Sequence, residues 1–196
     1  EIYNFLKISK NKNSLQKYNS FSRIVNSLKI KEFDFVEPIF KYLHYKEYLN
    51  KLFTEPKFLK HASDLLGRDL AFITNPGLTL NLPGKNDPKT NYHFKDWHQE
   101  IWSGASPSCS VQIWTPLIQK SNSGHLEIIV DSHKWGHVPH SMRTPLKFPK
   151  NYKTKEINLN FGDVIIFSNL LLHRTMPTKF PRMALPCSIK NFKCRD

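Results

Sequence analysis

The sequence predicts a mainly β fold of the sandwich or jelly-roll type, with helices flanking it on the N-terminal side. From residue 69 onward, short segments alternate apolar and polar residues and are separated by turns, with no helical pattern between them. Residues 1–68 instead space their apolar residues as one face of a helix requires. The 196 residues contain no internal repeat and no linker. We therefore expect one domain, 1–196, in which a mostly helical flank (1–68) precedes a jelly-roll core (69–196).

The flank is predicted to consist of successive helices. Residues 14–28 place most of their apolar side chains three positions apart, which suits one helix face. Residues 35–53 continue in the same style. Pro56 interrupts the pattern, and residues 58–66 can form a shorter helix that ends at Gly67. Because this flank contains no chemical motif, we expect it to pack on the outside of a sheet rather than to carry a site.

Short strands are predicted throughout the core, separated by turns rich in Gly, Pro and Asn. They are expected at residues 70–74, 78–82, 109–115, 125–130, 157–161, 164–167, 170–173 and 182–189. The connection 131–154 differs from the other connections because it is long, irregular and rich in Pro and His. A connection of that length in a compact domain is usually functional or mobile, so it is a candidate lid over a site.

The composition is that of a globular and strongly basic chain. Hydrophobic residues make up 39% of the sequence and 14 residues are Phe, which argues against a disordered protein. No run of about 18 apolar residues occurs, so no membrane span is expected. The net charge of +13 suits nucleic acid, anionic lipid or an acidic substrate, or else reflects lysines spread over solvated faces. Since no nucleic-acid-binding motif appears, we do not expect a nucleic-acid partner.

The three cysteines, Cys109, Cys187 and Cys194, do not suggest a disulfide framework. Their number is odd, they are widely spaced, and no CxxC pair indicates zinc. The first residues also lack the pattern of a secretory signal. Together these features predict a reducing compartment and a cytoplasmic location.

Two segments far apart in the chain carry candidate metal ligands. His98 and Glu100 lie two positions apart within residues 96–102, and in an extended segment such residues point to the same face. His173 can join them from a neighbouring strand. Two imidazoles and one carboxylate, with the remaining coordination positions open, form the ligand set of non-haem Fe(II) oxygenases. The same ligands can hold zinc, so the residues alone do not fix the metal.

A second group of histidines, His133, His137 and His140, has the spacing H-x3-H-x2-H. One interpretation is a zinc-binding or substrate-binding loop. The other is a set of ordinary loop histidines. Gly136 and Pro139 favour the second interpretation, because they break the helix that such spacing would need.

Further motifs accompany the candidate ligands in a fixed order. They are Trp-His-Gln-Glu at 97–100, Trp-Thr-Pro-Leu at 114–117, Ser-Gly-His-Leu at 123–126, Asp-Ser-His-Lys at 131–134, Phe-Gly-Asp at 161–163, and Arg182 with Ala184. Through these motifs residues 70–193 resemble the phytanoyl-CoA dioxygenase superfamily of Fe(II)/2-oxoglutarate oxygenases. The family usually has Asp where this chain has Glu100, and Pro-Gly where it has Val130 and Asp131.

The resemblance implies a double-stranded β-helix with the N-terminal helices packed outside it. His98, Glu100 and His173 match the metal ligands of the family, which are also its catalytic residues. Arg182 matches the Arg that pairs with the distal carboxylate of 2-oxoglutarate, and a guanidinium fork can hold such a group bidentately. Thr175 matches a hydroxyl position that helps to hold this carboxylate.

Other candidate site residues depend on their place in a strand or loop. Asn81 and Gln112 are polar residues on alternating strands that can face the barrel interior. In similar enzymes an amide at the position of Asn81 contacts cosubstrate or substrate. Trp102 either forms a wall of the substrate pocket or belongs to the core, whereas Trp97 and Trp114 are interpreted as packing residues.

The function that the resemblance implies is an oxygenase that uses Fe(II), 2-oxoglutarate and O2 to hydroxylate a small organic substrate. The basic charge suits an anionic substrate. The alternative is a non-catalytic jelly-roll module that binds an acidic ligand or a structural metal, and Glu100 in place of Asp keeps this alternative open. Nucleic-acid binding driven by charge ranks last among the hypotheses.

Overall fold

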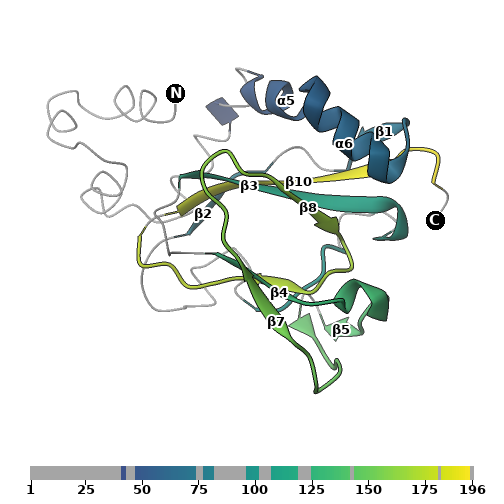
Figure 1. The fold of residues 1–196 in the computed structure, drawn as a ribbon, viewed down its shortest axis with the longest axis vertical. Coiled ribbons are helices and arrows are strands. Elements are labelled where there is room, and N and C mark those ends of the chain that lie inside the picture. The colour runs from purple at the N-terminus through teal and green to yellow at the C-terminus, as the bar shows by residue number, and fades with distance from the viewer. Residues whose placement is uncertain are drawn as a thin grey trace, which may run out of the picture.

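Two β-sheets face each other across a packed interior in this computed structural model, and the helices lie on the outer side of one sheet (Figure 1). The structure describes residues 41–42, 47–73, 77–81, 96–101, 107–118, 125–141, 144–180 and 182–194. The main sheet has the strand order β1–β10–β3–β8, with β2 also paired to β10, and the second sheet has the order β7–β4–β9. This is the double-stranded β-helix that the sequence predicts.

All strand pairs within the described residues are antiparallel. The main sheet contains β1 (Leu70–Phe72), β2 (Thr79–Asn81), β3 (Ser110–Ile118), β8 (Ile165–Ser168) and β10 (Arg182–Asn191). The second sheet contains β4 (Leu126–Ile129), β7 (Thr154–Ile157) and β9 (His173–Thr175), and β5 (His140–Ser141) pairs with β6 (Thr144–Pro145). The helices are α5 (Tyr48–Phe53) and α6 (Pro56–Leu66), with 3-10 turns η1 (Pro107–Cys109) and η2 (Ser132–Trp135).

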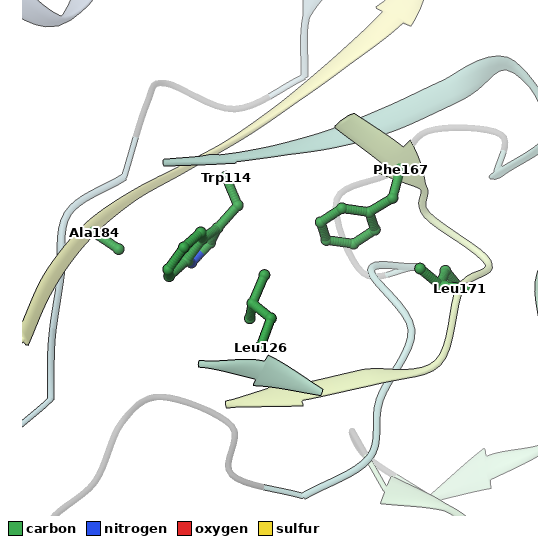
Figure 2. Packing of buried hydrophobic residues seen from close by; sticks show 5 residues of the cluster. All are labelled: Trp114, Leu126, Phe167, Leu171 and Ala184. Atoms are coloured by element: carbon green, nitrogen blue, oxygen red, sulfur yellow. The ribbon is translucent and has the colours of Figure 1, made fainter. Parts of the chain in front are cut away.

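The space between the two sheets is filled by side chains from both. Figure 2 shows the aromatic rings of β3 and β8 pointing toward β4. The buried cluster consists of Trp114, Leu126, Phe167, Leu171 and Ala184. Alternate residues of a strand share a face, so Gln112 of β3 and Arg182 of β10 also lie on the side of the main sheet that faces the interior. Val111 and Ile113 alternate with these residues and are buried on the opposite side. Helix α6 lies over that side of the main sheet (Figure 1).

Helix α6 confirms the one helix prediction that the described residues test in full. Its first turn contains Pro56, and the chain leaves the helix at Gly67, where φ is 87° and the backbone N–H donates to Ser63 O at 2.8 Å. A positive φ of this size favours glycine. The predicted helix at 14–28 lies outside the described residues, as does much of 35–53. No helix in the described ranges is both long and apolar enough to cross a membrane.

Two predictions about the connections are wrong in detail. The strand expected at 157–161 shares only Ile157 with the observed β7 (Thr154–Ile157). A turn closed by Asp163 follows: its carboxylate accepts the N–H of Asn160 at 2.7 Å and its own N–H donates to Asn160 O at 3.0 Å. Gly162, with φ 94°, permits that turn. The connection 131–154 is less irregular than expected, since it contains η2 and the β5–β6 pair.

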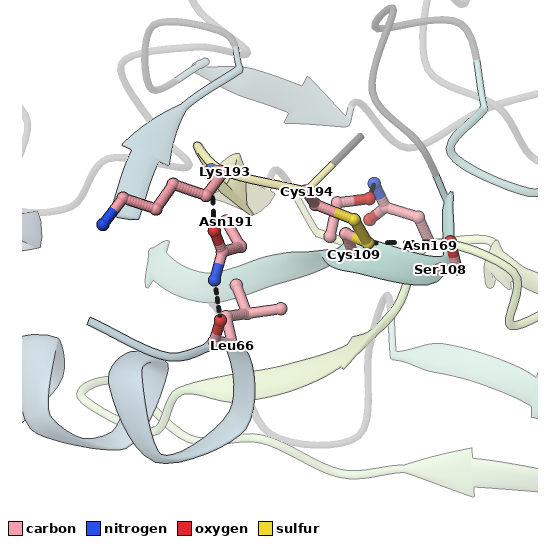
Figure 3. The surroundings of a disulfide bond; sticks show 8 residues. Leu66, Ser108, Cys109, Asn169, Asn191, Lys193 and Cys194 are labelled. Carbon is pink, nitrogen blue, oxygen red and sulfur yellow. Dashed lines mark hydrogen bonds between the residues drawn. A yellow bond between two sulfur atoms is a disulfide. The ribbon is translucent and has the colours of Figure 1, made fainter. Parts of the chain in front are cut away.

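The expectation of unpaired cysteines is wrong for two of the three. Cys109 and Cys194 form a disulfide across 85 residues of sequence, with their Cα atoms 6.1 Å apart (Figure 3). Antiparallel pairing places the start of β3 beside the end of β10, which brings these cysteines together. Cys187 is the free cysteine, and burial raises the pKa of its thiol to about 12.

Candidate metal centre

Three predicted ligands, His98, Glu100 and His173, meet at one end of the second sheet. Their ligand atoms all lie within 4.8 Å of one another. Oε1 of Glu100 is 3.5 Å from Nε2 of His98 and 3.6 Å from Nε2 of His173. Two ligand atoms that each bind an ion at about 2.1 Å can be up to about 4.2 Å apart, so the two distances from the Glu100 carboxylate to the imidazoles suit one shared ion. In the described part of the chain this is the only group of three or more His, Cys, Asp or Glu side chains so placed.

Backbone hydrogen bonds hold the two ligand segments side by side. His98 and His173 form an antiparallel bridge in which each N–H donates to the other's carbonyl oxygen at 3.1 Å. The N–H of Glu100 donates to Asn169 O at 2.9 Å. Because β9 itself pairs with β4, the segment 98–100 continues the second sheet beyond β9. The relative position of the ligands is therefore set by main-chain pairing.

The hydrogen bonds of the two imidazoles assign their tautomers. Nδ1 of His98 lies 2.8 Å from Asp96 O, and Nδ1 of His173 lies 3.0 Å from Leu171 O. A carbonyl oxygen only accepts, so each Nδ1 carries the proton and donates it. In a neutral ring Nε2 then presents a lone pair toward Glu100. Three electron-pair donors thus converge on one point, an arrangement that a cation stabilises.

Burial and neighbouring groups shift the pKa values of His98 and Glu100 toward the protonation states that metal binding requires. His98 and His173 are 4% and 5% exposed. Burial lowers the pKa of His98, and the neighbouring His173 lowers it further, against the opposing effect of Glu100. Burial alone would raise the pKa of Glu100, but its interactions with the His173 and His98 side chains outweigh this effect and hold the pKa well below its usual range. The centre therefore combines a carboxylate with a neutral His98 at neutral pH.

A buried arginine occupies the facing wall of the interior, on the main sheet. Arg182 begins β10 opposite Asn81 of β2, and its Nη2 donates to Asn81 Oδ1. Its guanidinium carbon lies 4.9 Å from the centre of the Trp114 ring, and the residue is 1% exposed. Nδ2 of Asn81 is buried without a hydrogen-bond partner among the described residues. A guanidinium and an amide donor in such a place suit a carboxylate.

With this geometry in view, comparison with known proteins identifies the family. The model of the phytanoyl-CoA dioxygenase (PhyH) family matches residues 23–184, which is most of the chain. The chain belongs to the PhyH family. No curated protein matches it significantly.

Solved structures share the PhyH-type fold at low sequence identity. EvdO2 from Micromonospora carbonacea var. aurantiaca, complexed with 2-oxoglutarate, is 19% identical over 74% of this chain and 64% of that one, with a TM-score of 0.55. The epimerase SnoN, in complex with Fe3+, alpha ketoglutarate and nogalamycin RO, is 16% identical over 72% of this chain and 58% of that one, with a TM-score of 0.60. The non-heme monooxygenase ThoJ is 18% identical over 70% of this chain and 52% of that one, with a TM-score of 0.56. The chain thus spans between 52% and 64% of the length of these structures.

The remaining candidate site residues from the sequence fall into two groups. Thr175 lies two positions beyond His173 on β9 and is buried on the same face of the strand. Gln112 faces the interior, where its Oε1 accepts a hydrogen bond from the Ser188 hydroxyl. Trp102 lies outside the described residues. The structure thus places two more polar candidates on interior faces and does not test the third.

The other aromatic and histidine residues that the sequence singled out either pack in the core or pair with each other in a loop. Trp114 belongs to the buried cluster, and Trp97 packs beside Leu172 and under the guanidinium of Arg174, at 4.5 Å. Both confirm their interpretation as packing residues. His137 and His140 have ring nitrogens 3.2 Å apart. Within the residues that the structure describes, they do not join a third ligand into a metal-binding group, which favours the interpretation as loop histidines.

Two buried polar residues beside the candidate ligands were not predicted from the sequence. Gln99 and Asn169 are 2% and 0% exposed, and both bind the segments that carry the ligands. A signal for Gln99 was present, because it stands between two ligands and points away from them in an extended segment. No local signal marks Asn169, whose partner Ser110 comes from a distant strand.

Proposed function

We propose that this PhyH-family chain is an Fe(II)- and 2-oxoglutarate-dependent oxygenase that hydroxylates a small organic substrate. The observation that carries the proposal is the convergence of the Nε2 atoms of His98 and His173 with the carboxylate of Glu100. Two imidazoles and a carboxylate with open positions are the ligand set of this class. The longer side chain of Glu100, where the family usually has Asp, still brings an oxygen to both imidazoles.

The arginine on the main sheet supports 2-oxoglutarate as the cosubstrate. In this proposal Arg182 pairs with the distal carboxylate of 2-oxoglutarate, and Asn81 and Thr175 contribute polar contacts. The burial of Arg182 in the barrel interior supports the role, because a desolvated guanidinium binds a carboxylate strongly and directionally. The complexes of EvdO2 with 2-oxoglutarate and of SnoN with Fe3+ and alpha ketoglutarate, on the same fold, also support it.

In this proposal the residues of the chain bind and orient the ion and 2-oxoglutarate, and they exclude water from the interior. When bound, Fe(II) and 2-oxoglutarate supply oxidation of a substrate C–H bond by O2, with succinate and carbon dioxide as coproducts. Glu100 offsets part of the positive charge of the ion, and the Nδ1 hydrogen bonds of His98 and His173 fix the ring orientations. The interior cluster around Trp114 and Phe167 keeps water from the opposite wall. The connection 131–154 is the candidate lid.

For the substrate, the chain supports a proposal about its charge, and for the location it supports a correction. The net charge of +13 favours an anionic small molecule as substrate. The sequence predicted a cytoplasmic location, but the Cys109–Cys194 disulfide is of a kind that persists in oxidising compartments and is rare in the cytosol. The disulfide therefore argues against the cytoplasmic location that the sequence predicted.

The proposal is tested with purified protein, Fe(II) and 2-oxoglutarate. Anaerobic mixing should produce the weak visible metal-to-ligand band of the ternary complex. Admission of O2 in the presence of ascorbate, which supplies the two electrons that a substrate would otherwise provide, should produce succinate. His98→Ala should abolish both signals, whereas His133→Ala, which changes an exposed histidine outside the centre, should leave both intact. Absence of the band and of succinate in the wild type would instead favour the non-catalytic binding module.

A further inference from the structure

Gln99 makes an unusually complete set of side-chain hydrogen bonds for a residue placed between two ligands. Its Nε2 donates to Gly136 O at 2.9 Å and to Leu170 O at 2.6 Å. Its Oε1 accepts the N–H of Val138 at 2.9 Å. The side chain is buried, on the face of the segment opposite to His98 and Glu100. Both amide hydrogens and the amide oxygen are thus engaged, which fixes the orientation of the side chain.

These bonds join three segments of the chain. One is the ligand segment 98–100, the second is the loop 169–172 that leads into His173, and the third is the stretch 136–138 after η2. Main-chain bonds fix His98 to His173 and tie the backbone of Glu100 to Asn169 O. The Gln99 amide adds a side-chain link from the same segment to both neighbours.

We infer that Gln99 is a positioning residue, which sets the distance between the Glu100 carboxylate and the two imidazoles by fastening the ligand segment to residues 170 and 136–138. The inference rests on the proposed metal site. The purely structural role, in which Gln99 only stabilises the core, predicts a different outcome. Loss of a purely structural bond lowers stability without changing the affinity of the folded protein for the ion.

The test compares anaerobic Fe(II) binding by the wild type, Gln99→Met and Thr115→Val. Gln99→Met keeps the length of the side chain and removes all three hydrogen bonds. Thr115→Val is the matched control, because it removes the buried hydrogen bond from Thr115 Oγ1 to Asp163 O (2.7 Å) on the main sheet. We expect Gln99→Met to raise the Kd for Fe(II) about tenfold or more, as loss of outer contacts of metal ligands does. The control should keep the wild-type Kd although it is less stable.

Each result separates this inference from the proposed function. If the wild type does not bind Fe(II), the proposed function fails. If the wild type binds and Gln99→Met matches it within about twofold, with the same visible band in the presence of 2-oxoglutarate, the positioning role is overturned. If Gln99→Met does not fold, Gln99→Asn, which withdraws the amide by one methylene, is measured by the same criteria.

Discussion

The two polar walls of the barrel interior carry opposite charge and are held in different ways. On the second sheet, the metal corner (His98, Glu100 and His173) gathers lone pairs and one negative charge. On the main sheet, the arginine corner (Arg182 and Asn81) presents a buried positive charge. Main-chain bonds position the metal corner, whereas the strand register and the hydrogen bond from Arg182 to Asn81 contribute to the position of the arginine corner.

This difference indicates how each corner should respond to change. The backbone fixes the positions of the side chains in the metal corner. Replacement of one ligand therefore removes one metal contact that the other residues cannot move to replace. In the arginine corner, the long side chain of Arg182 itself makes the proposed contact with the cosubstrate. The loss of cosubstrate affinity should therefore depend on how closely a replacement side chain reproduces the shape of the guanidinium. In the proposed function, 2-oxoglutarate binds at both corners, with its keto acid end at the ion and its distal carboxylate at Arg182. The following predictions test whether the corners act separately.

Glu100→Gln should have the largest effect, because the amide keeps the shape of the side chain but removes the only anionic ligand of the metal corner. We expect the Kd for Fe(II) to rise more than about 100-fold, beyond the range for contacts outside the ligand set. The measurement is anaerobic titration calorimetry.

The matched control for this prediction is Glu127→Gln. Glu127 lies on β4 of the same sheet but pairs with Arg174, at 2.7 Å, away from the centre. This variant should lose about 1–3 kcal/mol of stability and keep its Fe(II) affinity. Equal loss of Fe(II) affinity in both variants would contradict a localised metal corner.

Arg182→Lys should weaken 2-oxoglutarate binding by about tenfold or more, since an ammonium cannot reproduce the bidentate guanidinium contact. Binding of Fe(II) alone should stay at the wild-type level, because Arg182 is not a ligand. Both constants can be measured by titration, first with Fe(II) and then with 2-oxoglutarate. Weaker Fe(II) binding in this variant would show that the two corners are coupled.

The pH dependence should distinguish the corners as well. Burial and the neighbouring His173 hold the pKa of His98 below its ordinary value of 6.5, and only the unprotonated ring binds a metal. Above about pH 6.5, titration of His98 should therefore not affect the affinity for Fe(II). As the pH falls through the lowered pKa of His98, the affinity should fall by up to tenfold per pH unit. The Arg182 charge does not change in this range. A loss of affinity that is complete by about pH 7 would contradict the lowered pKa.

Thr175→Val should have the smallest effect. The substitution keeps the shape of a buried side chain on β9 and removes one hydroxyl. Loss of one hydrogen bond of about 1 kcal/mol corresponds to a roughly fivefold rise in the Kd for 2-oxoglutarate. Titration at fixed Fe(II) measures it, and an unchanged constant would remove Thr175 from the cosubstrate site.

Much of the fold and the ligand set could be predicted from the sequence, because both depend on local patterns. Alternation over residues 109–115 and the short apolar segment 182–189 marked the central strands, and the i, i+2 spacing of His98 and Glu100 placed two ligands on one face. Motif order supplied His173 and Arg182. These features survive in the structure because strand periodicity directly determines the facing of side chains.

What the sequence did not predict depends on pairing between distant segments. The Cys109–Cys194 disulfide follows from the antiparallel register of β3 and β10, which spacing along the chain does not contain. The contacts of Gln99 depend on how residues 136–138 fold back against the ligand segment. The end of β7 at Ile157 reflects a local turn made by Asp163, which competes with the alternating pattern.

The most direct test of the account is the position of iron in crystals soaked anaerobically with Fe(II), located by anomalous scattering at the iron edge. The account predicts one peak at about 2.0–2.2 Å from Nε2 of His98, Nε2 of His173 and a carboxylate oxygen of Glu100. A peak elsewhere, or no peak in protein that retains this fold, would contradict it.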